Sequence, residues 1–152
     1  MAAAFRASAT AIVSTAATTI TITKPTGTID GDVMITDITH GLDIDEDAAL
    51  TITTLTGWTL VRSTAGPVGA TTPYFRHHTF RRVASGEGAN YTWTISASDR
   101  IVGSCKTYSG VDNTTTVDAE GGQLNAAATA MTAPSITTTV ADTMLVFSGG
   151  AG

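Results

Sequence analysis

The feature that most constrains this chain is a two-residue alternation of threonine with apolar residues. The run TTITIT at residues 18–23 places threonine on one side of an extended backbone, and Ile20 and Ile22 on the other. About a fifth of the 152 residues are threonine, and β-branched side chains favour a pleated sheet over a helix. No segment carries a convincing apolar stripe of helical period. The sequence therefore predicts an all-β fold.

Turn signals built from Gly, Pro and Asp divide the chain into short runs of this kind. We expect strands at residues 18–23, 33–38, 50–55, 58–63, 74–84, 91–95, 100–108, 135–140 and 143–148. The fifth and sixth of these are expected to pair as a hairpin, and a turn at Ser98–Asp99 is expected before the seventh. Residues 111–131 are expected to form a surface excursion, with one weak helix candidate at 124–130.

About ten short strands at this spacing predict one domain, residues 1–152, folded as an antiparallel β-sandwich. Greek-key or jelly-roll connections both fit the strand spacing. We interpret residues 1–17, ahead of the first turn signal, as a candidate assembly arm.

Charge and composition exclude several classes of partner. The net charge is −5 with only 8 basic residues, which disfavours nucleic acid, because phosphate binding needs an excess of Lys and Arg. No run approaches the roughly 20 apolar residues of a membrane span. The single cysteine, Cys105, excludes an internal disulfide and is expected to be a buried, small apolar side chain.

Two stretches suggest metal binding, and neither has the required pattern. The acidic run DIDED at residues 43–47 lacks the register of an EF-hand loop, so we interpret it as a solvated loop. His77 and His78 are adjacent on a predicted strand and should point to opposite faces, where they cannot readily share an ion. We expect no metal site and no cofactor.

Aromatic residues leave a sugar-binding alternative open. Trp58 and Trp93 are expected in the core, yet together with Tyr74 they could instead stack on a host-surface glycan. An exposed, coplanar pair of these rings would favour a carbohydrate-binding module.

Catalytic motifs are not evident in the sequence. There is no Gly-x-Ser-x-Gly elbow and no spacing that indicates a Cys–His nucleophile. A glycosidase would need two facing carboxylates, for which Asp99, Asp112 and Asp118 are the scattered candidates. We expect no catalytic residue and a non-enzymatic role.

An ordered set of motifs resembles a recurrent β-module of bacteriophage virion proteins, especially minor tail and tail-tip proteins of phages that infect actinobacteria. These motifs lie at residues 24–35 (KPTGTIDGDVMI), 57–60 (GWTL), 81–95 (RRVASGEGANYTWTI), 108–112 (YSGVD) and 133–139 (APSITTT). Their order and spacing cover most of the chain.

The first two motifs have a physical rationale. Pro25 fixes its own φ, Gly27 and Gly31 allow positive φ, and Asp30 can cap the turn, which together make a corner. The small Gly57 lets the bulky ring of Trp58 enter the core at the start of a strand. Such motifs specify a fold and supply no reactive group.

The resemblance implies a virion structural protein at the tail tip, acting in assembly or host attachment. Its partners would be other virion proteins and copies of itself. A capsid decoration protein on the head is the alternative within the virion. Look-alikes continue with a further strand where this sequence stops at Gly152, so we expect either a longer chain or a neighbouring chain that completes the sandwich.

Overall fold

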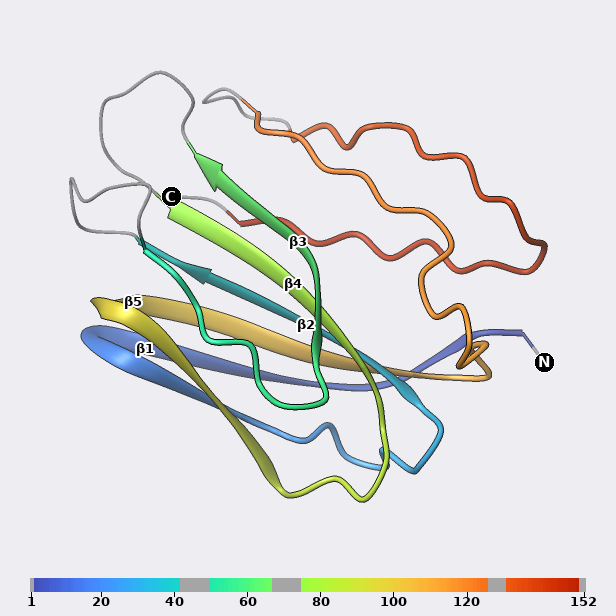
Figure 1. Ribbon diagram of the computed structural model, residues 1–152, viewed down its shortest axis with the longest axis horizontal. Helices are drawn as coiled ribbons and strands as arrows, with labels where there is room; N and C mark the ends of the chain where they lie inside the picture. Colours follow the sequence, from blue (N-terminus) through green and yellow to red (C-terminus); the bar gives the residue numbers. More distant parts are fainter. Residues whose placement is uncertain (1, 42–49, 67–74, 126–130, 151–152) are drawn as a thin grey trace.

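The computed structural model describes residues 2–41, 50–66, 75–125 and 131–150, and this part of the chain is all-β (Figure 1). Its strands are β1 (Ala4–Thr23), β2 (Val33–His40), β3 (Thr59–Gly66), β4 (Phe75–Val83) and β5 (Asn90–Ser109). The all-β prediction is confirmed, but the expected ten short strands are replaced by five, two of which are 20 residues long. None of the described residues forms a helix that could cross a membrane.

The five strands form one antiparallel sheet in the order β1-β5-β2-β4-β3. The predicted hairpin between residues 74–84 and 91–95 is wrong, because β2 lies between β4 and β5. At the centre of β2, Thr36 pairs with Phe80 on one side and with Cys105 on the other. Most of β2 is buried on both faces, so β2 takes a central place in the sheet. This burial outweighs the local turn signal that would have made β4 and β5 neighbours.

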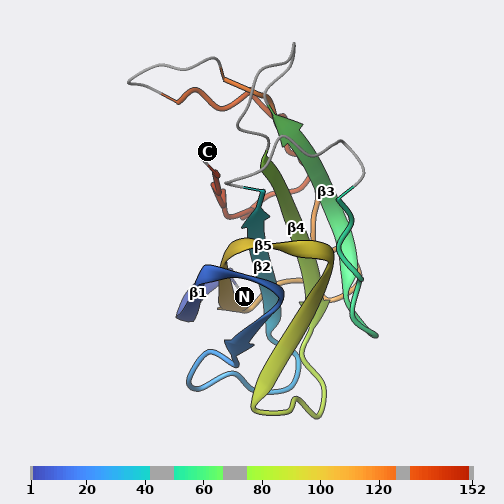
Figure 2. The same cartoon turned by 90° about the vertical axis from the view of Figure 1, so that its left-hand side faces the viewer.

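The long strands β1 and β5 bend together. Register shifts fall between Val13 and Ala17 and between Ala17 and Thr19, and β5 continues through Asp99, where the sequence predicts a turn. Bulges of this kind bend a strand and increase its twist. The half of the β1–β5 ribbon beyond these shifts, which ends at Thr23 and Asn90, therefore folds back across one face of the sheet (Figure 2).

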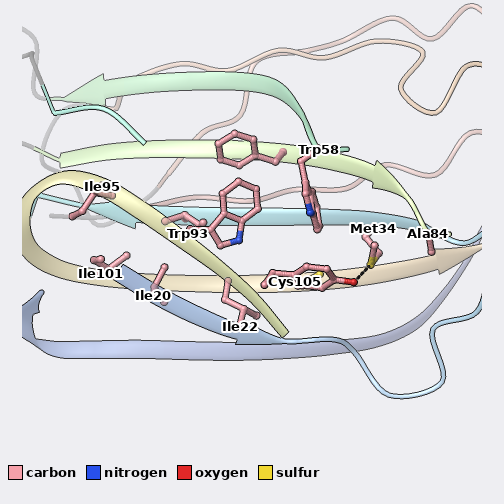
Figure 3. Close-up of a cluster of buried hydrophobic side chains, with 12 residues drawn as sticks. Ile20, Ile22, Met34, Trp58, Ala84, Trp93, Ile95, Ile101 and Cys105 are labelled. Atoms are coloured by element: carbon pink, nitrogen blue, oxygen red, sulfur yellow. Dashed lines mark hydrogen bonds between the residues drawn. The ribbon is translucent and has the colours of Figure 1, made fainter. Parts of the chain in front are cut away.

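The hydrophobic core fills the space between the folded-back ribbon and the sheet (Figure 3). Trp93 of β5 packs on Phe80 of β4 with ring centroids 4.3 Å apart, although these strands are not neighbours in the sheet. Trp58 meets Trp93 edge to face at 5.3 Å. A two-sheet sandwich with jelly-roll connections is not confirmed, since the two packed layers come from one open sheet that bends back on itself.

The corner between β1 and β2 follows the sequence closely. Gly27 and Gly31 have φ of 78° and 87°, as their motif predicts. Asp32, rather than Asp30, caps the local turn by accepting a hydrogen bond from the Ile29 amide at 3.0 Å. The Asp30 side chain instead accepts a bond from the amide of Gly86, which ties the corner to the β4–β5 connection.

Residues 111–125 and 131–150 pass over the opposite face of the sheet in extended runs outside the five strands (Figure 1). The excursion predicted over residues 111–131 is confirmed where the structure describes it. The predicted strands at 135–140 and 143–148 are wrong, since neither run pairs with a strand of the sheet. Residues 50–55 are also no strand and make only an isolated bridge, Ile52 to Ile95.

Gly103 marks the closest approach of the folded-back ribbon to the sheet. A Cβ at this position would lie 2.8 Å from Cδ1 of Ile22 and 3.4 Å from the carbonyl oxygen of Asp37. Only a residue without a side chain allows the two layers to meet here.

Replacing Gly103 by alanine should therefore strain the core and lower the free energy of unfolding by about 1–3 kcal/mol. Urea denaturation measures this change. The matched control is Gly88→Ala, because a Cβ at Gly88 has no atom within 4 Å. Equal stabilities of the two variants would contradict the proposed close approach.

Candidate functional site

A polar cluster lies on the outer face of the sheet, opposite the core. Adjacent positions of three strands bring it together, because Asp37 pairs with Thr79 of β4 and with Ser104 of β5. Lys106 donates to Oδ2 of Asp37 at 2.7 Å, and the Thr79 hydroxyl donates to Oδ1 at 2.8 Å. His77 Nε2 lies 3.6 Å from the same carboxylate.

The Asp37 carboxylate is charged and well compensated. Burial alone would raise the pKa of Asp37, but the nearby His77 ring and the Lys106 ammonium outweigh it and hold that pKa far below its usual value. Asp37 is therefore an acceptor of fixed charge at neutral pH, and a poor proton donor or general acid.

Ser148 brings the C-terminal segment to this cluster. Its hydroxyl lies 3.3 Å from His77 Nε2, and His77 Nδ1 lies 2.8 Å from the Thr39 hydroxyl. A Ser-His-Asp triad needs its nucleophile and its acid on opposite ring nitrogens, whereas Ser148 and Asp37 both face Nε2. The arrangement differs from a triad and serves to hold the segment against the sheet.

A second cluster, inside the core, holds two stacked histidines. His78 faces inward and His77 outward, which confirms that these neighbours point to opposite faces. Nε2 of His40 lies 3.1 Å from Nε2 of His78, and the two rings are nearly parallel at 11°. Such a hydrogen bond needs one ring as donor and the other as acceptor, so the accepting imidazole must be neutral.

The surroundings of this histidine pair keep it uncharged. Burial, reinforced by the nearby His40 ring and the charge of Arg76, lowers the pKa of His78 to about 4. Burial also lowers the pKa of His40, against an opposing effect of the buried Asp99 carboxylate. Within the described residues, no group of three or more His, Cys, Asp or Glu side chains could hold a metal ion.

The two tryptophans are core residues, as expected. Trp58 is 6% exposed and Trp93 is fully buried, so neither indole offers a face to a sugar. Tyr74 and the acidic run at residues 43–47 lie outside the described residues.

The other candidate residues from the sequence are either buried in the fold or hydrogen-bonded to neighbouring side chains. Cys105 is buried as predicted, and burial raises the pKa of its thiol to about 11, which makes it a poor nucleophile. Asp99 is buried and closed to a substrate. Asp112 and Asp118 accept hydrogen bonds from Thr114 and Thr139 in the C-terminal segment.

The feature that sequence reasoning missed is the contrast between the two edges of the sheet. At the β3 edge, a register shift separates Leu60 from Arg62, and Arg62 forms an ion pair with Glu120 of the C-terminal segment at 2.6 Å. Irregularity, charge and cover are the means by which proteins block unwanted strand pairing. The β3 edge is protected in all three ways.

The β1 edge has none of these protections over residues 7–13. This run pairs with β5 in regular register and contains no charge and no proline. Among the described residues, β5 is its only neighbouring strand. Residues 4–17, part of the candidate assembly arm, thus belong to a paired strand whose outer side is open. Ile12, 75% exposed, lies directly opposite Val102, 39% exposed, and a shallow pocket of about 240 Å³ adjoins them.

Comparison with known proteins identifies no relative of this chain. No protein-family model, curated protein sequence or solved structure matches the chain.

The buried histidine pair predicts a pH-dependent stability. Because the folded pKa of His78 is about 4, the unfolded chain binds the proton first, and stability should fall between pH 6.5 and pH 4. The loss from His78 alone is about 3 kcal/mol. His78→Leu should be less stable at pH 7, where His40 loses its partner, yet should lose less stability on acidification. Urea denaturation across this range checks it, and a flat wild-type profile would refute it.

The Asp37–Lys106 pair predicts a measurable coupling. Asp37→Asn leaves the partly buried ammonium of Lys106 without its counter-charge and should cost about 2–3 kcal/mol of unfolding free energy. Adding Lys106→Met to that variant should cost little more. A double-mutant cycle should therefore give a coupling of about 1–2 kcal/mol, whereas additive effects would mean that the pair contributes nothing specific.

Proposed function

We propose that this chain is a non-enzymatic structural protein of a bacteriophage virion, located at the tail tip and acting in assembly or host attachment. The observation that carries the assembly role is the unprotected β1 edge. A long, uncharged edge is a liability in a solitary protein and an asset in one that joins other chains. The phage assignment itself is supported by the ordered motifs.

Those motifs occupy positions that determine the fold. Residues 24–35 form the corner from β1 into β2, and residues 81–95 span the end of β4, its connection and the start of β5. Gly57, with φ of 80°, precedes Trp58 as it enters the core. These three motifs build structure, which suits a module reused for its shape.

A sandwich arrangement belongs to the same proposal. The bent sheet would supply one part, and the strand-like runs at residues 135–140 and 143–148 would supply another when an edge is available to pair with them. Partners would then be other virion proteins and copies of this chain.

Immunogold electron microscopy of purified virions tests the proposal. Antibodies raised against the protein should label the tail tip, with pre-immune serum as the control. Labelling of the head would instead support the capsid decoration alternative. Particles that carry no label, with the protein present only in the soluble lysate, would overturn the virion assignment.

A further inference from the structure

The C-terminal segment contains an exposed, strand-like run at residues 143–148 (TMLVFS). Exposure alternates along it: Met144 is 40% exposed, Leu145 77%, Val146 38% and Phe147 59%. This two-residue period is that of an extended strand with one side turned toward its own sheet and the other toward solvent. Four consecutive large apolar residues left this open indicate a surface that becomes covered by a partner.

Within the described residues, this run makes no backbone hydrogen bond and is held to the sheet at its end. Ser148 contacts His77 of β4, and a Cβ at Gly150 would meet Thr39 of β2. From β4, the order of the sheet places the chain's own β1 three strands away, or about 14 Å at the usual strand spacing. The run is thus positioned away from the one unprotected edge of its own sheet.

The β1 edge and the run at residues 143–148 have the properties of two strands that can pair with each other. Both are uncharged, lack proline and have similar lengths. A strand added beside β1 would extend the exposed pair of Val102 and Ile12 into a row of apolar side chains across the sheet. Leu145 and Phe147 are the side chains that could continue such a row.

The exposed area of the chain is large enough for such a contact. The surface is 8411 Å², whereas a monomeric protein of 15.5 kDa exposes about 7,200 Å². A standard interface removes roughly 800 Å² from each partner, which is a small part of this surface. One copy can therefore use the run at residues 143–148 and the β1 edge at the same time, each in a contact with a different partner.

We propose that copies of this protein join head to tail, with residues 143–148 of one copy adding as a strand to the β1 edge, residues 7–13, of the next. The contact is heterologous, because donor and acceptor are different surfaces, so it builds a ring or an open filament. This inference rests on the proposed assembly function and names its partner as a second copy of the chain.

Two charge substitutions test the contact, one on each surface. Ile12→Lys blocks the acceptor edge and Leu145→Lys blocks the donor run; both side chains are exposed, so the fold should be retained. Sedimentation velocity of the wild-type protein should show assemblies larger than a dimer. Each variant alone should be monomeric, with association weakened roughly tenfold or more by the buried charge. Leu60→Lys, on the protected β3 edge, is the matched control and should assemble like the wild type.

Mixing the two variants distinguishes head-to-tail joining from symmetric pairing. The intact donor of Ile12→Lys can bind the intact acceptor of Leu145→Lys, so the mixture should form a one-to-one dimer and no larger species. A wild-type protein that stays monomeric at high concentration would overturn the inference. Assembly that survives Leu145→Lys but not Ile12→Lys would also overturn it, in favour of two β1 edges pairing with each other.

These results separate the contact from the proposed function. Head-to-tail assembly of a protein that labels no virion would leave the contact standing and reject the phage role. Conversely, a protein that is found in virions, is monomeric and is insensitive to both substitutions would leave the phage role standing and reject the contact.

Discussion

The fold depends on the return of the β1–β5 ribbon onto its own sheet. A single open sheet has two faces to cover, and here the sheet covers one of them with its own bent edge, where Trp93 packs on Phe80 of the non-adjacent strand β4. Gly103 lets the two layers touch, and the register shifts near Ala17 supply the bend. Because the β1–β5 ribbon provides seven of the twelve buried residues of the core cluster, the core depends on this bend.

Local patterns predict much of this molecule, and long-range pairing explains the rest. Alternation identified β2, β3 and β4 nearly to their ends, and the turn chemistry of Gly27 and Gly31 located the corner. Alternation says nothing about which strands become neighbours, so the hairpin prediction failed when the heavily buried β2 took the central position. The sequence around Asp99 also cannot distinguish a bend within one strand from a turn between two strands, because small and polar residues occur in both.

The candidate sites also divide into features that local patterns predict and features that depend on long-range pairing. That His77 and His78 face opposite ways follows from strand geometry alone. The core position of Trp93 follows from the usual burial of a tryptophan within a strand. The stacking of His40 on His78 joins strands paired only in three dimensions and could not be predicted from spacing. The same holds for Asp37, whose partners Thr79 and Lys106 come from two other strands.

The bend that builds the core also determines which edge stays open. Once the ribbon turns back, β1 lies at the end of the sheet, and β5 is its only strand neighbour in the part of the chain that the structure describes. The C-terminal segment is held over the outer face by His77 and Arg62. The segment therefore protects the β3 edge and leaves the β1 edge exposed. Chain connectivity thus separates a strand-like donor from a strand-like acceptor within one molecule, and this separation favours pairing between copies over pairing within a copy.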